Sequence, residues 1–364
     1  MDDVTSASPA LPSVAFWSGR RVLLTGHTGF KGAWLALWLR HLGAEVLGVS
    51  LPGEPASPRL WDDLAEPLGV TDVQADLAEP GWEHHVEAFA PDVVLHLAAQ
   101  ALVPVGYREP LRTFASNVMG TARVLDVVSS LDSVVVAVMV TTDKVYDPRQ
   151  APPHRESDFL GGHDPYAASK AAAELVVSSW PRSSARVVTA RAGNVIGGGD
   201  WSPDRLVPDL VRAWAAGDPA TLRMPGAVRP WQHVLQPLHG YLLYAERLWD
   251  GPDLPAALNF GPDDTQAVTV GELVDHAAET WRHGGGTLPD PATTTVPMPD
   301  VVETGHLEID STLATSALGW RNAVDWRTAT EWTIDWYRRA PVTSAAALMR
   351  EQLDAYEKRV QSHG

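Results

Sequence analysis

Short, almost continuously apolar runs alternate with amphipathic segments in the first half of the chain. The runs have the composition of strands buried on both faces, and the segments between them carry apolar residues at helical spacing. This alternation predicts an α/β fold built on a Rossmann-type, doubly wound parallel sheet. The predicted strands are Arg21–Thr25, Glu45–Ser50, Val70–Ala75, Val93–Ala98, Val134–Val140 and Arg186–Ala192. The predicted helices are Ala33–Leu42, Leu111–Leu131 and Tyr166–Trp180.

The composition and the predicted elements change after Ala192, where Gly- and Pro-rich loops separate short helices. The tail from Thr328 onward has a helical pattern. We therefore expect a flexible tail over residues 1–16, a Rossmann domain over 17–192 and a smaller mixed C-terminal domain over 193–364. Residues 229–262 are expected to return in part to the first domain. The second half is predicted to contain helices at Leu206–Ala216, Leu238–Trp249 and Val270–Arg282, and a solvent loop at Gly284–Pro299.

Charge and composition narrow the possible partners. The 364 residues include 28 Lys and Arg against 45 Asp and Glu, a formal net charge of −17, which argues against nucleic acid or an anionic membrane as partner. The chain contains no cysteine, so disulfides, thiolate nucleophiles and cysteine-ligated zinc are excluded, and we expect no metal site. The longest apolar run is too short to span a bilayer and the N-terminus lacks the pattern of a signal peptide. We expect a soluble, cytoplasmic protein.

A glycine-rich turn follows the first strand and opens the first helix. Its sequence, TGHTGFKG, places Gly26, Gly29 and Gly32 at three-residue spacing. Such a turn lets the backbone approach a pyrophosphate and aims free N–H groups of a helix N-terminus at the anion. We predict a dinucleotide site here, in which Thr28, Phe30 and Lys31 take part and His27 adds positive charge.

The identity of the dinucleotide depends on the end of the second strand. Ser50 stands where an NAD site usually has an acidic residue for the 2′-hydroxyl, and no arginine follows at once to accept a 2′-phosphate. Asp76 and Leu77, after the third strand, are candidates for the adenine edge. Without an arginine beside the ribose, NAD is favoured over NADP.

Tyr166 and Lys170 are four residues apart on a predicted helix and therefore lie one above the other. A lysine in that place is expected to lower the phenol pKa and to hold a ribose hydroxyl, so that the tyrosine can take a proton while a hydride leaves. The hydroxyl of Thr142, at the end of a strand, is expected to bond the substrate hydroxyl beside Tyr166.

With these residues, the chain resembles the extended short-chain dehydrogenase/reductases that act on sugar nucleotides, most closely the CDP-glucose 4,6-dehydratases. The resemblance spans roughly residues 17 to 360, and RPWQHV and GNVIGGGDW are its most specific parts. The motifs that carry it are TGHTGFKG, HLAAQALV, NVMGT, TTDKVY, DPYAASK, RAGNVIGGGDW, DRLVPD and RPWQHVLQP.

The resemblance implies an internal redox cycle with NAD as cofactor. Tyr166 would deprotonate the glucose 4-hydroxyl while the C4 hydride moves to NAD; water is then eliminated across C5–C6, and the hydride returns to C6. Asp143 is the candidate acid of the elimination and Lys144 the candidate base, although Lys144 could instead stabilise the enolate electrostatically. Ala98, Ala99 and Asn117 lie in family-like stretches and are expected at the cofactor.

The same resemblance assigns the substrate side. Arg205, Arg229 and Asn194 are expected to bind the diphosphate, since arginine grips phosphate with a planar fork. Trp231 and His233 are expected to shape the base pocket. The family usually dimerises through two long helices, which here are Leu111–Leu131 and Tyr166–Trp180, so we expect a homodimer. Departures from the family, such as Thr142 where Ser is frequent, leave the redox residues in place.

Two alternatives stay open at this point. One is a 4,6-dehydratase or an epimerase acting on another nucleotide sugar; the pair Asp143-Lys144 argues against a simple epimerase, which eliminates no water. The other is a catalytically silent NAD sensor or scaffold on the same fold. The presence of both Tyr166 and Lys170 argues against it.

Overall fold

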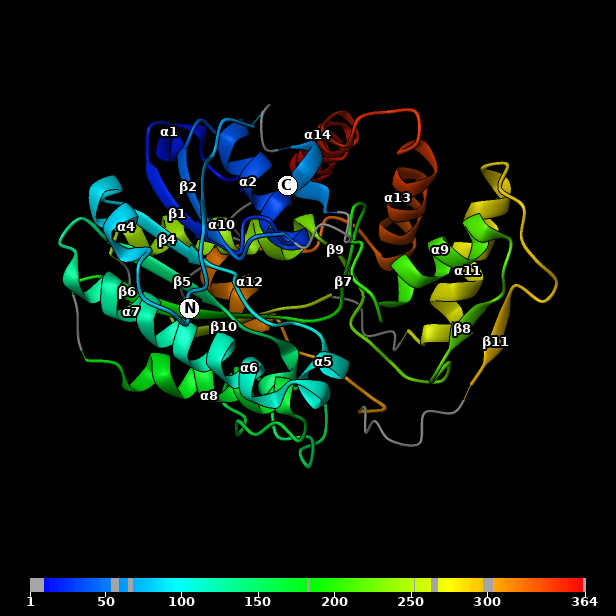
Figure 1. The fold of residues 1–364 in the computed structure, drawn as a ribbon, viewed down its shortest axis with the longest axis horizontal. Coiled ribbons are helices and arrows are strands. Elements are labelled where there is room, and N and C mark those ends of the chain that lie inside the picture. Colours follow the sequence, from blue (N-terminus) through cyan, green and yellow to red (C-terminus); the bar gives the residue numbers. More distant parts are fainter. Residues whose placement is uncertain are drawn as a thin grey trace, which may run out of the picture.

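The computed structural model describes residues 10–53, 59–64, 68–181, 184–251, 253–262, 268–296 and 304–362. At its centre lies a seven-stranded parallel sheet with the order β10-β6-β5-β4-β1-β2-β3 (Figure 1). The predicted Rossmann-type fold is confirmed. The strands are β1 (Arg21–Thr25), β2 (Glu45–Ser50), β3 (Thr71–Gln74), β4 (Val93–His96), β5 (Val136–Val140), β6 (Arg186–Ala192) and β10 (Ala257–Phe260).

The continuous apolar character of the strands reflects burial on both faces. Alternate residues of β1 enter different clusters: Val22 and Leu24 pack on the side of α2 (Phe30–His41), and Leu23 on the opposite side. The first face is covered by α2, by α10 (Leu235–Trp249) and by the C-terminal helix. The other face is covered by α4 (Glu83–Phe89), α7 (Gly120–Ser130) and α8 (Pro165–Ser179).

A smaller lobe stands beside the sheet (Figure 1). In it α11 and α13 pack on each other, and α9 packs on β8. Short strand pairs join β8 to β11 and β7 to β9. The elements of the second half other than α10 and β10 are β7 (Val195–Ile196), α9 (Leu206–Ala216), β8 (Ala220–Leu222), β9 (Gln232–His233), α11 (Val270–His283), β11 (Thr293–Thr295), α12 (Thr312–Leu318), α13 (Trp326–Arg339) and α14 (Ala345–Ser362).

Most predicted helices and strands are found within a few residues of their expected bounds, and one differs in kind. The predicted helix Leu111–Leu131 is divided into α6 (Pro110–Phe114), a π-helical turn at Ala115–Met119 and α7. The π turn carries the buried side chain of Asn117, which accepts from the backbone N–H of Gln100 in the loop after β4, at 2.8 Å. The remaining short helices of the first half are α1 (Val14–Trp17), η1 (Leu60–Asp63), α5 (Val103–Arg108) and η3 (Asp143–Val145).

Two further expectations need correction. The predicted solvent loop Gly284–Pro299 contributes β11, which pairs in parallel with β8, although residues 297–299 lie outside the described part. The tail predicted to be flexible is docked where it is described. Ser13 donates its backbone N–H to Glu246 Oε1 at 2.7 Å, and Trp17 donates its indole N–H to the same oxygen at 2.5 Å. Residues 1–9 of that tail lie outside the described residues.

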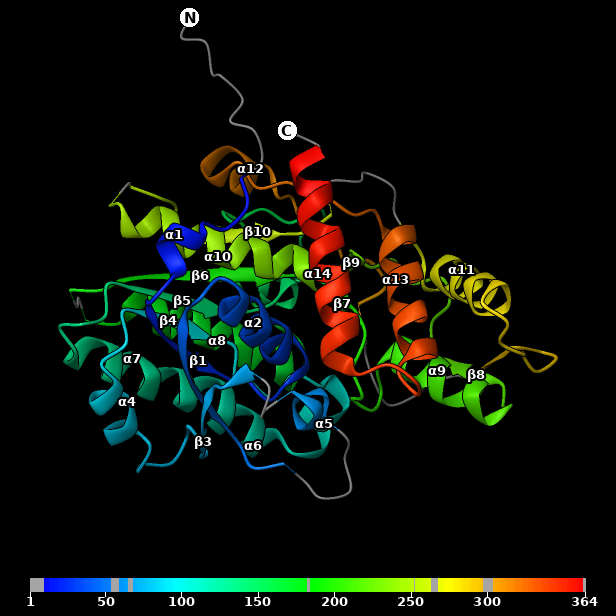
Figure 2. The same ribbon diagram turned by 90° about the horizontal axis from the view of Figure 1, so that it is seen from above.

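The C-terminal helix α14 belongs to the core of the nucleotide-binding half although it comes last in the chain. It crosses beside α2 and α13 (Figure 2). Tyr356 is fully buried and meets the ring of Trp38 from α2 edge-on, with ring centroids 5.8 Å apart. Its hydroxyl and His239 Nδ1 of α10 are 3.1 Å apart, and Nε2 of the same imidazole lies 2.8 Å from the carbonyl oxygen of Ala10. Within the described residues, none of these helices is long and apolar enough to cross a bilayer.

Candidate active site

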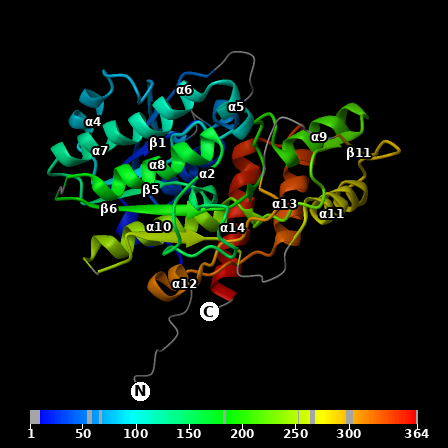
Figure 3. The same cartoon turned by 90° about the horizontal axis from the view of Figure 1, so that it is seen from below.

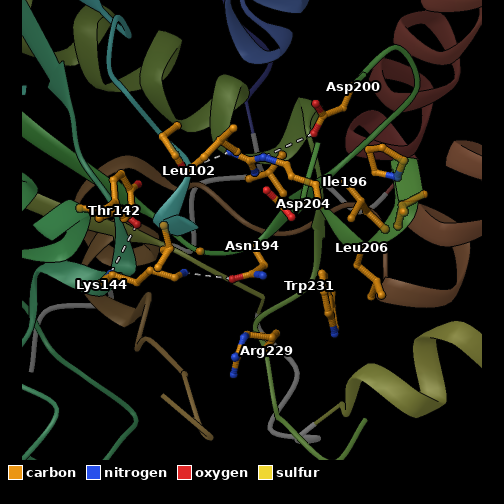
Figure 4. A pocket seen from close by; sticks show the side chains of 18 of the residues that line it. Leu102, Thr142, Lys144, Asn194, Ile196, Asp200, Asp204, Leu206, Arg229 and Trp231 are labelled. Atoms are coloured by element: carbon orange, nitrogen blue, oxygen red, sulfur yellow. Dashed lines mark hydrogen bonds and ion pairs between the residues drawn. The ribbon is translucent and has the colours of Figure 1, made fainter. Parts of the chain in front are cut away.

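A pocket opens at the carboxyl edge of the sheet, between the strand ends and residues of the smaller lobe; Figure 4 shows its lining side chains. The strand order reverses beside β1, which lies between β4 and β2, and open α/β sheets bind their ligands at such a switch point. Side chains from the ends of β5 and β6, from α8 and from the loops of the smaller lobe line it together. The polar lining residues include Lys31, Thr142, Lys144, Tyr166, Lys170, Asn194, Arg205, Arg223 and Arg229.

The glycine turn brings the backbone close to the loop after β4. Gly26 has φ +74°, and a Cβ there would stand 2.6 Å from the backbone N of Ala98. A Cβ on Gly32 would stand 2.0 Å from the carbonyl oxygen of Gly26. Gly29 is the N-cap of α2 and has no side-chain cap, so the backbone N–H groups of the first helical turn stay available to a ligand. This backbone cradle fits the pyrophosphate of a dinucleotide.

The two cations predicted beside the phosphates take other places. His27 is fully buried, its Nε2 is 2.9 Å from Asp72 Oδ1, and burial lowers its pKa, so the positive charge expected of it is not supported. Lys31 turns into the pocket, where its Nζ donates to the hydroxyl of Tyr241 at 2.9 Å. Burial and the charges of Arg205 and Lys170 lower the pKa of Lys31 to about 7.

The remaining residues predicted at the cofactor surround the turn. Ala99 lines the pocket, while Ala98 meets the turn through its backbone. Asn117 is buried, and its amide accepts from the backbone N–H of Gln100 and donates to Gln100 O and Ser169 Oγ. Asn117 therefore holds the loop after β4 against α8, and its direct contact with a cofactor stays a prediction.

The residues predicted on the adenine side of the cofactor make contacts with the protein itself. Ser50 is buried at the end of β2, with its Oγ 3.0 Å from His27 Nδ1. It also accepts from the backbone N–H of Thr28 at 3.3 Å. Exposed Asp76 accepts from the backbone N–H of Ala78 at 2.9 Å, and Leu77 is packed in the core. Binding of an adenine edge by Asp76 and Leu77 stays a prediction.

Tyr166 and Lys170 lie buried on α8, beside the end of β5, as their spacing predicts. The predicted lowering of the phenol pKa by Lys170 is wrong in this structure. Burial raises the pKa of Tyr166 to about 12, against the opposite effects of its hydrogen bond with Thr142 and of the Arg205 charge. Lys170 directs its ammonium to the carbonyl oxygen of Val140, at 2.8 Å.

The predicted acid and base form a pair directly after β5. Asp143 Oδ1 accepts from Lys144 Nζ at 3.0 Å and from Thr142 Oγ1 at 2.9 Å. Asp143 Oδ2 is buried and has no hydrogen-bond partner among the described residues. Lys144 Nζ also donates to Asn194 Oδ1 at 3.3 Å, which ties the strand end to the loop after β6 (Figure 4). A buried carboxylate oxygen without a partner is costly, so it marks a place where a ligand group is expected.

The structure places four of the five residues predicted to bind substrate at the pocket, and the fifth away from it. Asn194, Arg205, Arg229 and Trp231 line the pocket. His233 does not: it is fully buried behind the pocket, between the edges of Trp34 and Trp332, because the chain turns there into α10.

Two residues were missed by the sequence reasoning: one lines the pocket, and the other bonds a pocket residue from behind the wall. Arg223, next to β8, lines the pocket and is paired with Asp204. Tyr241 of α10 is fully buried and accepts from Lys31 Nζ; burial, and to a lesser extent the neighbouring Tyr166 phenol, raises the pKa of Tyr241 above its usual value. The available signal was position: Arg223 precedes the RPWQHV motif by one short loop, and Tyr241 follows it on the same helix face as Pro237.

Comparison with known proteins decides the family. Residues 22–255 match the NAD dependent epimerase/dehydratase family, which is more than half of the chain. The chain belongs to this NAD dependent epimerase/dehydratase family.

Within the family, the chain is similar to several dehydratases. It is 39% identical over 340 residues to the CDP-glucose 4,6-dehydratase of Salmonella typhimurium, covering 89% of this chain and 92% of that protein. It is 29% identical to the dTDP-glucose 4,6-dehydratase of Streptomyces antibioticus, covering 81% and 80% of the two chains. The solved structure of DesIV, a dTDP-glucose 4,6-dehydratase from Streptomyces venezuelae with NAD bound, superposes with a TM-score of 0.74 at 25% identity, covering 88% and 98%.

Proposed function

We propose that this member of the epimerase/dehydratase family is an NAD-dependent lyase that converts CDP-glucose to CDP-4-keto-6-deoxyglucose. The observation that carries the proposal is the Asp143–Lys144 pair: Lys144 lines one pocket with Thr142 and Tyr166, and buried Asp143 bonds Lys144 and Thr142 from directly behind that lining. A redox pair alone serves an epimerase or a dehydrogenase. An acid and a base next to that pair serve elimination of water, and the similarity to a CDP-glucose 4,6-dehydratase supports the same substrate.

NAD is the proposed cofactor, and the glycine cradle with its free N–H groups fits its pyrophosphate. When bound, NAD accepts the hydride from C4 of the sugar and gives it back at C6, so that no net oxidant is consumed. Lys170, which is buried one helical turn after Tyr166, is proposed to hold the ribose.

The chain's own groups move the protons. Tyr166 takes the proton of the sugar 4-hydroxyl as C4 is oxidised, with Thr142 bonding the same oxygen. The 4-keto group acidifies the C5–H bond; Lys144 removes that proton, and Asp143 protonates the departing C6 hydroxyl, which leaves as water. Lys144 then gives its proton back to C5. The proton that Tyr166 took from the 4-hydroxyl replaces, by exchange with solvent, the one that Asp143 gave to the departing water, so every group regains its starting state. The sum is loss of one water.

The cations that line the pocket are proposed to bind the diphosphate. Arg229 is buried, and Arg205 is held near Asp200, with Arg205 Nε 3.8 Å from Asp200 Oδ2. In a chain of net charge −17, these arginines supply the local positive charge that the substrate needs. Trp231, also buried at the pocket wall, is proposed to shape the nucleotide-base site.

Incubation of the protein with CDP-glucose and NAD tests the proposal. We expect a product lighter by one water, with the alkaline absorbance of a 4-keto sugar and without accumulation of NADH. UDP-glucose and dTDP-glucose serve as matched controls and are expected to turn over at least about tenfold more slowly, since loss of one hydrogen-bonded base contact costs about 1–2 kcal/mol. Epimerised CDP-sugar of unchanged mass, or preference for another nucleotide, would contradict the assignment.

We also propose that the protein is cytoplasmic and forms a homodimer. The apolar side chains of Leu111, Met119 and Leu175 are exposed by 86%, 54% and 59%. They lie on α6, on the π turn and on α8, which pack side by side (Figure 3). An exposed apolar face on neighbouring helices is the surface that a second copy would bury. A cytoplasmic location fits an enzyme whose cofactor and substrate are cytoplasmic metabolites.

Charge on this face is expected to break the dimer. Leu175→Glu combined with Leu111→Glu should reduce the mass in solution from twice the chain mass to the chain mass, measured by light scattering after size exclusion. The matched control is Val342→Glu, because Val342 is also an exposed apolar residue, at 87%, but lies between α13 and α14. A double variant that keeps the dimer mass would place the interface elsewhere.

A further inference from the structure

Glu174 is a buried carboxylate that the proposed chemistry does not use. It lies one helical turn after Lys170 on α8 and is only 4% exposed. Both of its oxygens are occupied. Oε1 accepts from the hydroxyl of Thr141 and from Arg191 Nε at 3.0 Å, and Oε2 accepts from Thr189 Oγ1 at 2.8 Å and from Arg191 Nη2 at 2.8 Å. A buried carboxylate that accepts from four donors is held in one place.

Each partner of Glu174 belongs to an element that ends at the pocket. Thr141 directly precedes Thr142 at the end of β5, and Arg191 and Thr189 are on β6, whose next loop carries Asn194. The other end of the Arg191 guanidinium donates to the Tyr146 hydroxyl at 2.9 Å. Glu174 thus connects the helix of Tyr166 and Lys170 to the strand end that carries Asp143 and Lys144.

Glu174 is also the counter-charge of Lys170. Burial lowers the pKa of Lys170 to about 8, and the Glu174 carboxylate acts against this. Of the other groups that face Lys170, Lys31 from α2 has its pKa lowered to about 7 and has lost its charge before Lys170 titrates. His96 from β4, whose pKa burial lowers to about 3, is neutral. Tyr166 on the same helix is neutral as well, with its pKa raised to about 12.

We propose that Glu174, held by Arg191, is a positioning residue that keeps Lys170 charged and fixes the end of β5 beside it. This inference deepens the proposed function and rests on it, because it takes Lys170 as the group that holds the cofactor ribose. Glu174 touches neither cofactor nor substrate and acts through Lys170 and Thr141. The proposal separates two contributions of one side chain: its negative charge and its geometry.

The charge contribution has a signed pH dependence. A lysine donates to ribose hydroxyls most strongly in its charged form, so cofactor affinity is present below the pKa of Lys170 and is lost as the pH rises through about 8. Removing the Glu174 charge while keeping its shape lowers that pKa further. Glu174→Gln is therefore expected to move the alkaline limb of NAD affinity down by about 1 pH unit, a shift typical of one nearby buried charge.

The experiment is calorimetric titration of the full-length protein with NAD between pH 6 and 10 in about half-unit steps, a range set by the two pKa values of free lysine and of Lys170. Glu174→Asp keeps the charge and is expected to retain the wild-type limb. The double variant Glu174→Gln/Arg191→Met removes both buried charges, which proteins tolerate better than one unpaired charge, and is expected to share the lowered limb. Glu246→Gln is the matched control, a partly buried glutamate at the N-terminal docking site.

The outcomes separate this inference from the proposed function. A limb that stays at the wild-type pH in both Glu174→Gln and the double variant overturns the charge role. An equal shift in Glu174→Asp and Glu174→Gln overturns it too, since geometry alone would then account for the effect. The titration needs no sugar nucleotide, so a failure of CDP-glucose turnover would count against the substrate assignment and leave the NAD titration as an independent test of Glu174.

Discussion

Replacing Tyr166 with phenylalanine is expected to lower the rate of CDP-glucose dehydration by about 1000-fold, the usual contribution of a positioned proton-transfer group. The change deletes one oxygen from a buried side chain and leaves the ring packed on α8. Without the phenol, the 4-hydroxyl has no acceptor for its proton and C4 is not oxidised. The measurement is kcat from the absorbance of the 4-keto product, together with NAD affinity, which is expected to stay within a few fold.

Tyr244→Phe is the matched control for that variant. Tyr244 is a fully buried tyrosine of α10 whose hydroxyl donates to the carbonyl of Pro255, away from the pocket. The control is expected to lose stability and to keep its turnover. If Tyr166→Phe retained the wild-type rate, Tyr166 would not be the base for the first step.

The pH dependence of turnover follows from the same residue. The phenol must lose its proton to act as a base, and burial holds its pKa at about 12 in this structure. Activity therefore rises with pH on the acid side until the loss of charge on Lys170, near pH 8, opposes it. Bound NAD, whose nicotinamide is positively charged, would favour the phenolate and extend the active range downward.

The second large effect is expected at the eliminating pair. Lys144→Arg keeps a positive charge in place, but a guanidinium does not give up its proton in proteins and cannot serve as a base. If Lys144 removes the C5 proton, Lys144→Arg is expected to lower dehydration by about 1000-fold. Oxidation at C4 would persist, so NADH absorbance would rise in a single turnover, and exchange of the C5 proton with heavy water, followed by mass, would stop.

A different result assigns Lys144 the other role considered for it. If Lys144→Arg kept the exchange of the C5 proton and most of the turnover, the ammonium would act as an electrostatic stabiliser of the enolate. Asp143→Asn complements the test, because it removes the proposed acid and leaves the base. It is expected to retain exchange at C5 while expulsion of the C6 hydroxyl fails, and unchanged water loss in this variant would contradict the role of Asp143.

Features that depend on local sequence were predictable. The glycine turn, the i and i+4 placement of Tyr166 and Lys170, and the strand ends of β1, β2 and β6 all follow from spacing and apolar pattern. The π turn at Ala115–Met119 was not; the Asn117 side chain that it carries bonds the loop after β4, which is distant along the chain. The local sequence does not predict hydrogen bonds between residues that are distant along the chain.

The protonation states of the site residues could not be predicted from the sequence. That His27 is buried and uncharged, or that Tyr166 has a raised pKa, depends on how much of each side chain the fold covers. The Glu174–Arg191 pair joins residues of separate elements and was not singled out beforehand. The roles assigned to individual pocket residues and the boundaries of the two domains remain predictions, for which variants and substrates are the test.

The position of α14 has a consequence for synthesis of the chain. Trp38 belongs to α2, near the start of the chain, yet one of the rings that it meets, Tyr356, is made more than three hundred residues later. While the ribosome is still extending the chain, this tryptophan face therefore stays open to water and to other chains. Only when α14 has emerged can the first-made half reach its final packing, so release of the finished chain and completion of the fold come close together.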